Sequence, residues 1–313
     1  MNIVILGAGA LGSVLGGLMA RADISVTLLD LNQAHMDAVS TNGLTLTCDG
    51  ESFNLKLPAM RPEAYKGPAD LIILLTKTMH SGMALKSVRH LIDPGPGKAG
   101  AYVLTIQNGL GNSERVAELV SPDRILEGTT MINGRFLGPG SVATNGTSKT
   151  TFRAISEAAR PFVRELEQLL SPIGFVHDPD ANIVIWQKAA FNCAMNAIAA
   201  LGGARVGDIA NEPSAIVLAK AGAAEVVAIA NAKGIATDLG AVYAQIDKAL
   251  AEHKPHKPSM LQDLEAGRAT EIESLCGTVE REAENLSLAA PINMALAALI
   301  RLRENAAKAS WDG

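Results

Sequence analysis

The sequence predicts an α/β protein in which a doubly wound parallel sheet is followed by an all-α domain. In the first half, short runs of Ile, Val and Leu alternate with helical stretches, whereas after about residue 180 the candidate strands vanish and Ala-rich helices dominate. Such apolar runs are typical of strands buried on both faces of a parallel sheet, and strand–helix alternation implies right-handed crossovers. The length of 313 residues suits two domains, which we place at 1–178 and 179–313.

Individual elements follow from the same patterns. The expected strands of the sheet are 3–6, 25–29, 71–75 and 103–106. A small hairpin is expected from 45–47 and 52–57, and a polar, Gly-rich antiparallel strand region at 128–146. The helices expected in the second domain are 183–201, 213–233, 241–252, 271–284 and 291–308, with Pro291 as a first-turn proline of the last.

Composition and charge exclude several classes of protein. Hydrophobic residues make up 48% and charged residues 19%, which supplies large cores and argues against disorder. The formal net charge is -5 without a block of like charge, so neither a nucleic-acid platform nor a polybasic membrane patch is expected. We therefore expect a small-molecule ligand as partner.

Cysteine and histidine usage bears on metals and on the compartment. Cys48, Cys193 and Cys276 are far apart in the sequence, and the six histidines show no ligand spacing with carboxylates. Neither a metal site nor a disulfide framework is expected, and a reducing cytoplasm is the natural compartment. Because no uninterrupted apolar stretch of about 18 residues occurs and the chain begins directly with a strand, we expect neither a spanning helix nor a signal peptide.

The strongest local signal is a glycine-rich turn with the sequence Gly7-Ala8-Gly9-Ala10-Leu11-Gly12. It follows a strand and opens a helix, the context that a dinucleotide-binding turn requires. The first glycine permits the tight turn, the second lets a pyrophosphate approach the backbone, and the third allows close helix–strand packing. A merely structural turn is the alternative. Strand, helix and an acidic residue at the tip of the next strand together favour a Rossmann-type dinucleotide site.

That acidic residue is Asp30. A carboxylate at this place accepts hydrogen bonds from the ribose hydroxyls of NAD and repels the 2′-phosphate of NADP. No Arg or Lys follows within Leu31-Asn32-Gln33. The sequence therefore favours NAD(H). NADP(H) stays an alternative, because a more distant basic residue could hold the phosphate, and a solvated loop aspartate is the plain reading of Asp30.

Two further candidates follow expected strands, at the sheet edge where open α/β sheets bind ligands. Lys77 comes after the strand at 71–75, and Asn108 comes after the strand at 103–106, within Gln107-Asn108-Gly109. Lys77 would face the cofactor crevice, and the Asn108 turn could hold a ribose or the substrate. The alternatives are a solvated lysine and an ordinary turn.

Lys188, Asn192 and Asn196 share one face of an apolar helix, at i, i+4 and i+8. Burying such a stripe without partners is costly, so a ligand or an interdomain cleft is favoured over a solvated polar face. A desolvated lysine can have its pKa lowered toward neutrality, which suits a general acid. Taken singly, Ser259 is a helix N-cap candidate and Glu271 a first-turn helix glutamate.

Together these segments resemble the ketopantoate reductase (2-dehydropantoate 2-reductase) family, in order and over nearly the whole chain. The Lys-x-x-x-Asn-x-x-x-Asn helix and the Ser-Met-x-Gln-Asp segment are fairly specific to that family, whereas the glycine turn is shared with many dehydrogenases. The matching residues are Gly7–Gly12, Lys77, Asn108-Gly109, Lys188, Asn192, Asn196, Ser259-Met260-Leu261-Gln262-Asp263 and Thr270-Glu271-Ile272.

The resemblance implies an enzyme of pantothenate biosynthesis that reduces a 2-keto acid, by default 2-dehydropantoate, with NAD(P)H, often as a homodimer. Lys188 would protonate the carbonyl oxygen as hydride arrives, and Glu271 would contact and orient the substrate. The residues implied to line the substrate site or the nicotinamide ribose are Asn192, Asn196, Ser259, Lys77 and Asn108.

The chain departs from the family pattern at two places, which keeps other functions open. Asp30 stands where NADPH-using members carry a basic residue, and Val206 stands near an asparagine that some members use for the substrate hydroxyl. Arg205 is a candidate replacement anchor for a carboxylate, with a surface arginine as the alternative. The alternative is an NAD-dependent dehydrogenase of a different hydroxy acid or polyol-derived substrate. A non-catalytic NAD-binding regulator is less favoured, because Lys188 and Glu271 are both present.

Overall fold

The computed structural model describes residues 1–95, 97, 99–146 and 148–308. The chain forms two compact units. Unit 1 comprises Met1–Gln107 and Asn112–Ala181, and unit 2 comprises Asn108–Gly111 and Asn182–Gly313. The short segment Asn108–Gly111 follows a strand of unit 1, yet its contacts assign it to the helical unit 2.

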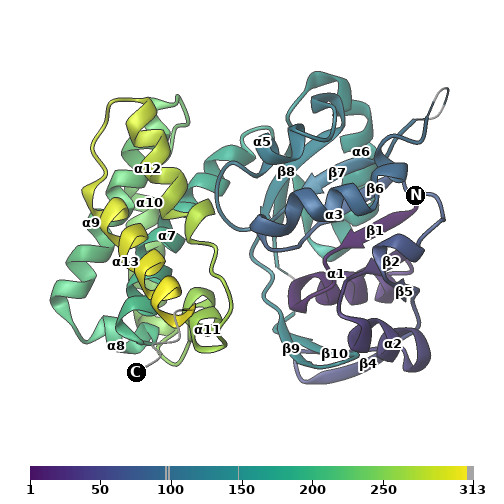
Figure 1. Cartoon of the computed structure of the whole chain (residues 1–313), viewed down its shortest axis with the longest axis horizontal. Helices are drawn as coiled ribbons and strands as arrows, with labels where there is room; N and C mark the ends of the chain where they lie inside the picture. The colour runs from purple at the N-terminus through teal and green to yellow at the C-terminus, as the bar shows by residue number, and fades with distance from the viewer. Residues whose placement is uncertain (96, 98, 147, 309–313) are drawn as a thin grey trace. The chain divides into compact units, whose positions relative to one another are not determined.

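Unit 1 is built on an eight-stranded sheet with the order β12-β11-β8-β7-β6-β1-β2-β5. All neighbouring pairs are parallel except β8 and β11. The α/β fold class with a helical second part is therefore confirmed (Figure 1). The strands are β1 Ile3–Leu6, β2 Val26–Leu29, β5 Ala59–Met60, β6 Leu71–Leu74, β7 Tyr102–Thr105, β8 Ile125–Thr130, β11 Thr150–Ala154 and β12 Phe175–His177.

Strand β1 lies between β6 and β2 in this sheet. Ile3 pairs in register with Val26 of β2 on one side and with Leu71 of β6 on the other. The order of strands along the chain reverses between β1 and β6, so the loops after these two strands leave the same edge of the sheet in opposite directions. Crevices at such a switch point are where open α/β sheets bind ligands.

Helices bury both faces of the sheet, as the continuous apolar runs require. On one face α1 (Ala10–Arg21) and α6 (Arg160–Leu170) pack over the odd-numbered residues of β1. On the other face α3 (Ser81–Ser87), α4 (Arg89–Ile92) and α5 (Asn112–Ala117) pack over its even-numbered residues. A strand that alternates between two cores has no solvated face, which explains its unbroken hydrophobicity.

A separate four-stranded sheet, with the order β4-β3-β10-β9, packs on α1. The expected hairpin is β3 (Leu44–Cys48) with β4 (Glu51–Leu55), and β9 (Arg135–Gly138) with β10 (Ser141–Thr144) is the expected antiparallel pair. The parallel pairing of β10 with β3 joins segments far apart in the chain. Local periodicity carries no signal for such a pairing.

Unit 2 is entirely helical over its described part. The helices are α7 Ala181–Gly202, α8 Val206–Ala210, α9 Pro213–Ala232, α10 Leu239–Glu252, α11 Ser259–Glu265, α12 Cys276–Asn285 and α13 Pro291–Lys308. Small and aliphatic side chains from α7, α9, α10, α12 and α13 form its core. Proline stands at the first position of α13, as expected.

Two local predictions in unit 2 were wrong. The expected helix 271–284 begins only at Cys276, because Ile272–Ser274 forms a separate 3-10 turn, so Glu271 lies outside the α-helix. Ser259 is the first residue of α11 and Pro258 is its cap residue, so Ser259 is no N-cap. Ser259 is therefore not placed by N-capping, and Glu271 is not placed by an interaction with the first turn of an α-helix.

Helix α9 has 20 residues and a mean hydropathy of 1.6 in its most apolar window, so by length and composition it could cross a membrane. Its inner face carries Ala223, Val226 and Ala230, all buried in the core of unit 2. Of that window, 39% is buried, so packing within unit 2 accounts for part of its apolar character.

Candidate active site

Two of the three glycines in the turn after β1 lie at close approaches to other backbone atoms. Gly7 has φ +104°, and a Cβ there would lie 2.4 Å from the backbone nitrogen of Thr76. A Cβ on Gly12 would lie 2.1 Å from the Gly7 carbonyl oxygen, whereas one on Gly9 would meet no atom within 4 Å. The first and third glycines are thus steric requirements. The second leaves open space at the N-terminus of α1.

The turn after β2 carries the Asp30 carboxylate and is contacted by the guanidinium of Arg61, which follows β5. The Asn32 backbone N–H donates to Asp30 Oδ1 (2.8 Å), and Arg61 Nη1 donates to the Leu31 carbonyl oxygen (3.3 Å). Arg61 also lies 3.6 Å from Glu63. Arg61 was missed because the two-residue strand β5, which brings it beside β2, is too short to show a period.

Gln107 locks the ends of β6 and β7 together. Its Nε2 donates to the Thr76 carbonyl oxygen (2.5 Å) and to Ser81 Oγ (2.9 Å), while Thr105 Oγ1 donates to its Oε1 (3.0 Å). This lock fixes the loop that carries the half-buried Lys77. A buried amide directly after an apolar strand was the available signal for this role, but the sequence alone does not say what the amide contacts.

The segment after Gln107 is fixed to the loop around Glu271. The Leu110 backbone N–H donates to the Ser274 carbonyl oxygen (2.7 Å). Gly109 has φ +90°, and a Cβ there would lie 2.4 Å from that same oxygen. Glycine is therefore required at this close approach, which holds the segment Asn108–Gly111 against Ser274 within unit 2.

A pocket in unit 2 gathers four of the predicted site residues, Asn108, Asn196, Ser259 and Glu271. Its lining is Asn108, Asn196, Ser259, Met260, Asp263, Glu271 and Leu275. Asn192 and Lys188 lie on the same helix as Asn196, one and two turns earlier, but are not in the lining; Lys77 belongs to unit 1. Asp263, which the sequence singled out only as part of a motif, also lines the pocket and accepts from Arg268 Nε (3.0 Å).

Lys188 has the altered acidity expected of a proton donor. Desolvation of its ammonium group lowers the pKa of Lys188 from 10.5 to about 8, and the nearby carboxylate of Glu271 opposes this change. At a pH slightly below 8 the Lys188 side chain is mostly protonated, and the free energy needed to release its proton is small. The pair thus combines a labile acid with a counter-charge that keeps it protonated at neutral pH.

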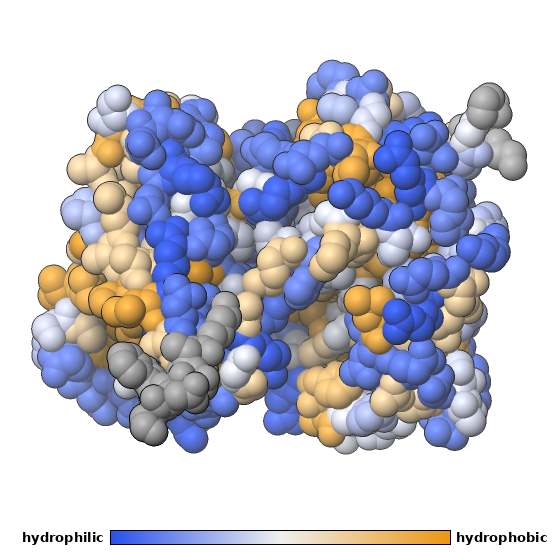
Figure 2. All heavy atoms as spheres, in the orientation of Figure 1, coloured by the Kyte–Doolittle hydropathy of each residue, from blue (hydrophilic) through white to orange (hydrophobic). Residues whose placement is uncertain are grey.

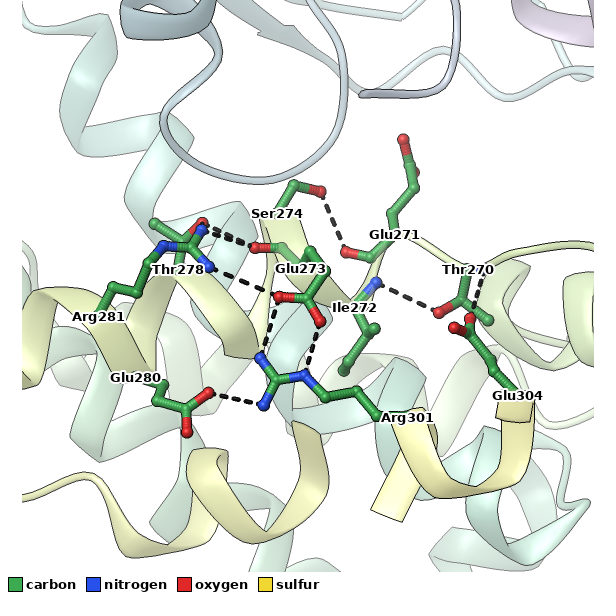
Figure 3. A network of polar contacts seen from close by, with 10 residues as sticks. All are labelled: Thr270, Glu271, Ile272, Glu273, Ser274, Thr278, Glu280, Arg281, Arg301 and Glu304. Carbon is green, nitrogen blue, oxygen red and sulfur yellow. Dashed lines mark hydrogen bonds and ion pairs between the residues drawn. The ribbon is translucent and has the colours of Figure 1, made fainter. Parts of the chain in front are cut away.

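Glu271 sits in a loop whose backbone is held from several sides (Figure 3). The Ile272 N–H donates to Thr270 Oγ1 (3.2 Å), the Thr270 N–H donates to Glu304 (2.7 Å), and Ser274 Oγ donates to the Glu271 carbonyl oxygen (3.0 Å). The carboxylate of Glu271 points away from all of these groups. The loop is therefore fixed by its backbone, and its acidic residue Glu271 lines the pocket.

An ion-pair network anchors the same loop to α12 and α13. Arg301 donates to both carboxylate oxygens of Glu273 (2.6 and 2.9 Å) and to Glu280 (2.8 Å) (Figure 3). Chiefly through the Arg301 hydrogen bond, the pKa of Glu273 is lowered. A bidentate pair of this kind has a specific geometry as well as charge, so it restrains the turn that follows Glu271.

Val206, considered for the substrate hydroxyl, and Arg205, considered as an anchor for a carboxylate, lie elsewhere. Val206 is 3% exposed and packs in the core of unit 2, and Arg205 is exposed at the start of α8. Neither belongs to the pocket lining. The loss of a substrate hydrogen bond at Val206 and an anchoring role for Arg205 therefore find no support in the pocket.

Comparison with known proteins places this geometry in a family. Residues 3–157 match the family described as Ketopantoate reductase PanE/ApbA, and residues 180–304 match its C-terminal part. The chain belongs to the ketopantoate reductase family. A 2-dehydropantoate 2-reductase of Pyrococcus horikoshii is 32% identical over 308 residues (97% of this chain, 98% of that one). The one of Halobacterium salinarum is 30% identical over 307 residues (97% and 99%).

Solved structures agree with this assignment. A ternary structure of D-mandelate dehydrogenase with NADH and anilino(oxo)acetate superimposes with a TM-score of 0.92 at 25% identity, covering 99% of this chain and 100% of that one. A 2-dehydropantoate 2-reductase from Geobacter metallireducens gives 0.88 at 29% identity (96% and 99%). This ketopantoate reductase family member is thus an oxidoreductase acting on CH–OH groups, which uses NAD(P)H to reduce a keto acid.

Proposed function

We propose that this chain reduces 2-dehydropantoate to pantoate, with Lys188 as the general acid. The observation that carries this proposal is the buried ammonium of Lys188 and its electrostatic interaction with the carboxylate of Glu271. Lys188 lies on α7, the helix that also brings Asn196 to the pocket. The full-length relatives named 2-dehydropantoate 2-reductase support the substrate. NAD(P)H, when bound, supplies the hydride.

The side chains of the site suit the charge that develops in this reaction. Hydride addition to the C2 carbonyl of a keto acid builds negative charge on its oxygen, which the ammonium of Lys188 stabilises and then protonates. Glu271 raises the pKa of Lys188 against desolvation, so the ammonium form prevails at pH 7. We assign Asn108, Asn192, Asn196 and Ser259 to the substrate as hydrogen-bonding groups, of which Asn108, Asn196 and Ser259 line the pocket with Glu271.

For the dinucleotide, we propose the turn Gly7–Gly12 as the pyrophosphate site, Asp30 as the adenine-ribose ligand and Lys77 beside the nicotinamide ribose. The open space at Gly9 supports the first assignment. We further propose that NADH is preferred over NADPH, because Asp30 would repel a 2′-phosphate. The NADH in the structure of D-mandelate dehydrogenase is in line with that preference. Arg61, which reaches the Leu31 carbonyl, is the basic group that would weaken it.

Initial rates with 2-dehydropantoate, measured with NADH and with NADPH at equal concentration, test the proposal. We expect fast turnover that favours NADH. A clear NADPH preference would overturn the assignment of Asp30. Fast reduction of an aromatic 2-keto acid with none of 2-dehydropantoate would instead support the alternative dehydrogenase. Lys188→Met should lower kcat about 10²- to 10⁴-fold, whereas Lys248→Met, which removes an exposed ion pair of α10, should leave kcat unchanged.

We propose in addition that the chain forms a homodimer through α9 and α13, which pack on each other in unit 2. Large apolar side chains are exposed on both helices, including Val217 (68%) and Leu302 (65%), and Figure 2 shows apolar surface on unit 2. Light scattering should give twice the chain mass, and Val217→Lys with Leu302→Lys should give monomers. We also propose a cytoplasmic location, in keeping with three free, buried cysteines.

A further inference from the structure

A fully buried histidine lies in unit 1, apart from the residues assigned above. His35 is on α2 (Gln33–Asn42) and has no exposed surface. Its Nε2 lies 2.8 Å from Ser13 Oγ on α1, and its Nδ1 accepts from the Gly140 backbone N–H (2.9 Å) in the turn between β9 and β10. One ring therefore joins α1, α2 and the small sheet.

The donor and acceptor of each hydrogen bond in the series from Gly140 through His35 and Ser13 to Ala8 are determined. Because Nδ1 accepts from a backbone N–H, the single proton of the neutral ring is on Nε2 and is donated to Ser13 Oγ. Ser13 Oγ in turn donates to the Ala8 carbonyl oxygen (2.8 Å). Burial lowers the pKa of His35, against the opposing field of Asp30, so the neutral ring prevails at pH 7. The ring cannot act as a base toward Ser13, which excludes a nucleophilic serine here.

The chain of hydrogen bonds ends inside the glycine turn. Ala8 is the second residue of the turn, and the Ser13 backbone N–H donates to the Gly9 carbonyl oxygen (2.9 Å). On the other side, a Cβ on Gly134 would lie 2.8 Å from the carbonyl carbon of Ala10, so the segment before β9 also abuts the first turn of α1. Both observations tie the small sheet to the turn.

We propose that His35 is a positioning residue for dinucleotide binding, acting through Ser13 on the carbonyl of Ala8. The backbone N–H groups of the turn can converge on a pyrophosphate only while its carbonyl groups point inward. The Ser13 hydroxyl holds the Ala8 carbonyl in that orientation, and His35 holds the hydroxyl. This inference rests on the proposed role of the glycine turn.

His35→Leu and Ser13→Ala test the proposal, because each removes one link. Losing one hydrogen bond to the turn should raise the KM and the Kd of the preferred dinucleotide about five- to tenfold. The kcat, and the KM of the keto acid at saturating dinucleotide, should stay within about twofold. His35→Gln, whose amide can both donate and accept, should recover most of the affinity. Ser13→Ala carries the test alone if His35→Leu does not fold.

Two controls separate the possible outcomes. Thr150→Val removes a buried hydroxyl pair elsewhere in unit 1 (Thr130–Thr150, 2.8 Å) and should lower Tm without changing dinucleotide affinity. Gly9→Val adds a side chain where no atom lies within 4 Å, so it should fold and lose the dinucleotide. Normal binding in Gly9→Val would overturn the turn assignment. If Gly9→Val loses dinucleotide binding while His35→Leu and Ser13→Ala bind with normal affinity, only the positioning role is overturned. The positioning role is also overturned if Thr150→Val loses as much dinucleotide affinity as His35→Leu and Ser13→Ala.

The double variant of His35 and Ser13 gives an independent measure. Because both links act on the same carbonyl, the loss of affinity in the double variant should match that of the larger single variant, not their product. A product of the two losses would mean that the residues act separately, which contradicts the proposed chain.

Discussion

Replacing Lys188 by methionine should make the protein more stable and nearly inactive. Desolvation lowers the pKa of Lys188 from 10.5 to about 8. At about 1.4 kcal/mol for each tenfold change, holding the proton in the folded state at pH 7 costs about 3 kcal/mol. Methionine has a similar volume and no charge. The substitution therefore removes the cost of burying the ammonium and should raise the free energy of unfolding by up to about 3 kcal/mol. Glu271 then loses its neighbouring cation, which reduces the gain.

The sign of the pH dependence follows from the two pKa values of Lys188. Between pH 8 and 10.5 the unfolded chain binds more protons at this residue than the folded protein, so wild-type stability gains from Lys188 as pH rises. The advantage of Lys188→Met should therefore be largest below pH 8 and vanish near pH 10.5. In activity, kcat should fall about 10²- to 10⁴-fold, as expected for loss of a general acid.

Denaturant titration of both proteins at pH 7 and pH 10, with reduced-nicotinamide absorbance for activity, measures these effects. Lys248→Met serves as the exposed control. In the wild type, kcat/KM for reduction should decline about tenfold per pH unit above pH 8, as the ammonium form is lost. A flat profile through pH 8, or a Lys188→Met protein less stable than wild type at pH 7, would refute the reasoning.

Three more outcomes follow from the site. Glu271→Gln should move the alkaline decline of kcat/KM to lower pH, because the carboxylate raises the pKa of Lys188; an unmoved decline in the pH profile would contradict this coupling. Gly12→Ala should destabilise the protein by several kcal/mol and lower its Tm, because its Cβ would lie 2.1 Å from a carbonyl oxygen; an unchanged Tm would refute the close approach. Arg301→Met should raise the KM of the keto acid more than it changes dinucleotide affinity, since it frees Glu273 and the turn after Glu271; equal effects on both ligands would argue against this anchoring.

Some positions could be predicted because their roles depend on local structure. The turn Gly7–Gly12 needs only a strand before it and a helix after it, and both are visible as periodic runs. Asn108, Asn196, Ser259 and Glu271 were found in separate segments, and the resemblance to ketopantoate reductases joined them before the structure brought them to one pocket. The helix boundary at Glu271 was wrong because the loop there is held by side chains that come from α13.

The sequence by itself determined the alternation of strands and helices and the glycine turn, because these depend on residues close together in the chain. It also determined the family, because several short motifs follow one another in the family's order. Only the tertiary structure decided that β10 joins β3, that Arg61 reaches the turn after Asp30, and that His35 contacts the Gly140 backbone. In each case the partners are distant in sequence and meet through backbone groups, which every residue carries. A pattern of side chains in the sequence does not indicate which distant backbone group a residue will contact, because that contact depends on the folded arrangement of the chain.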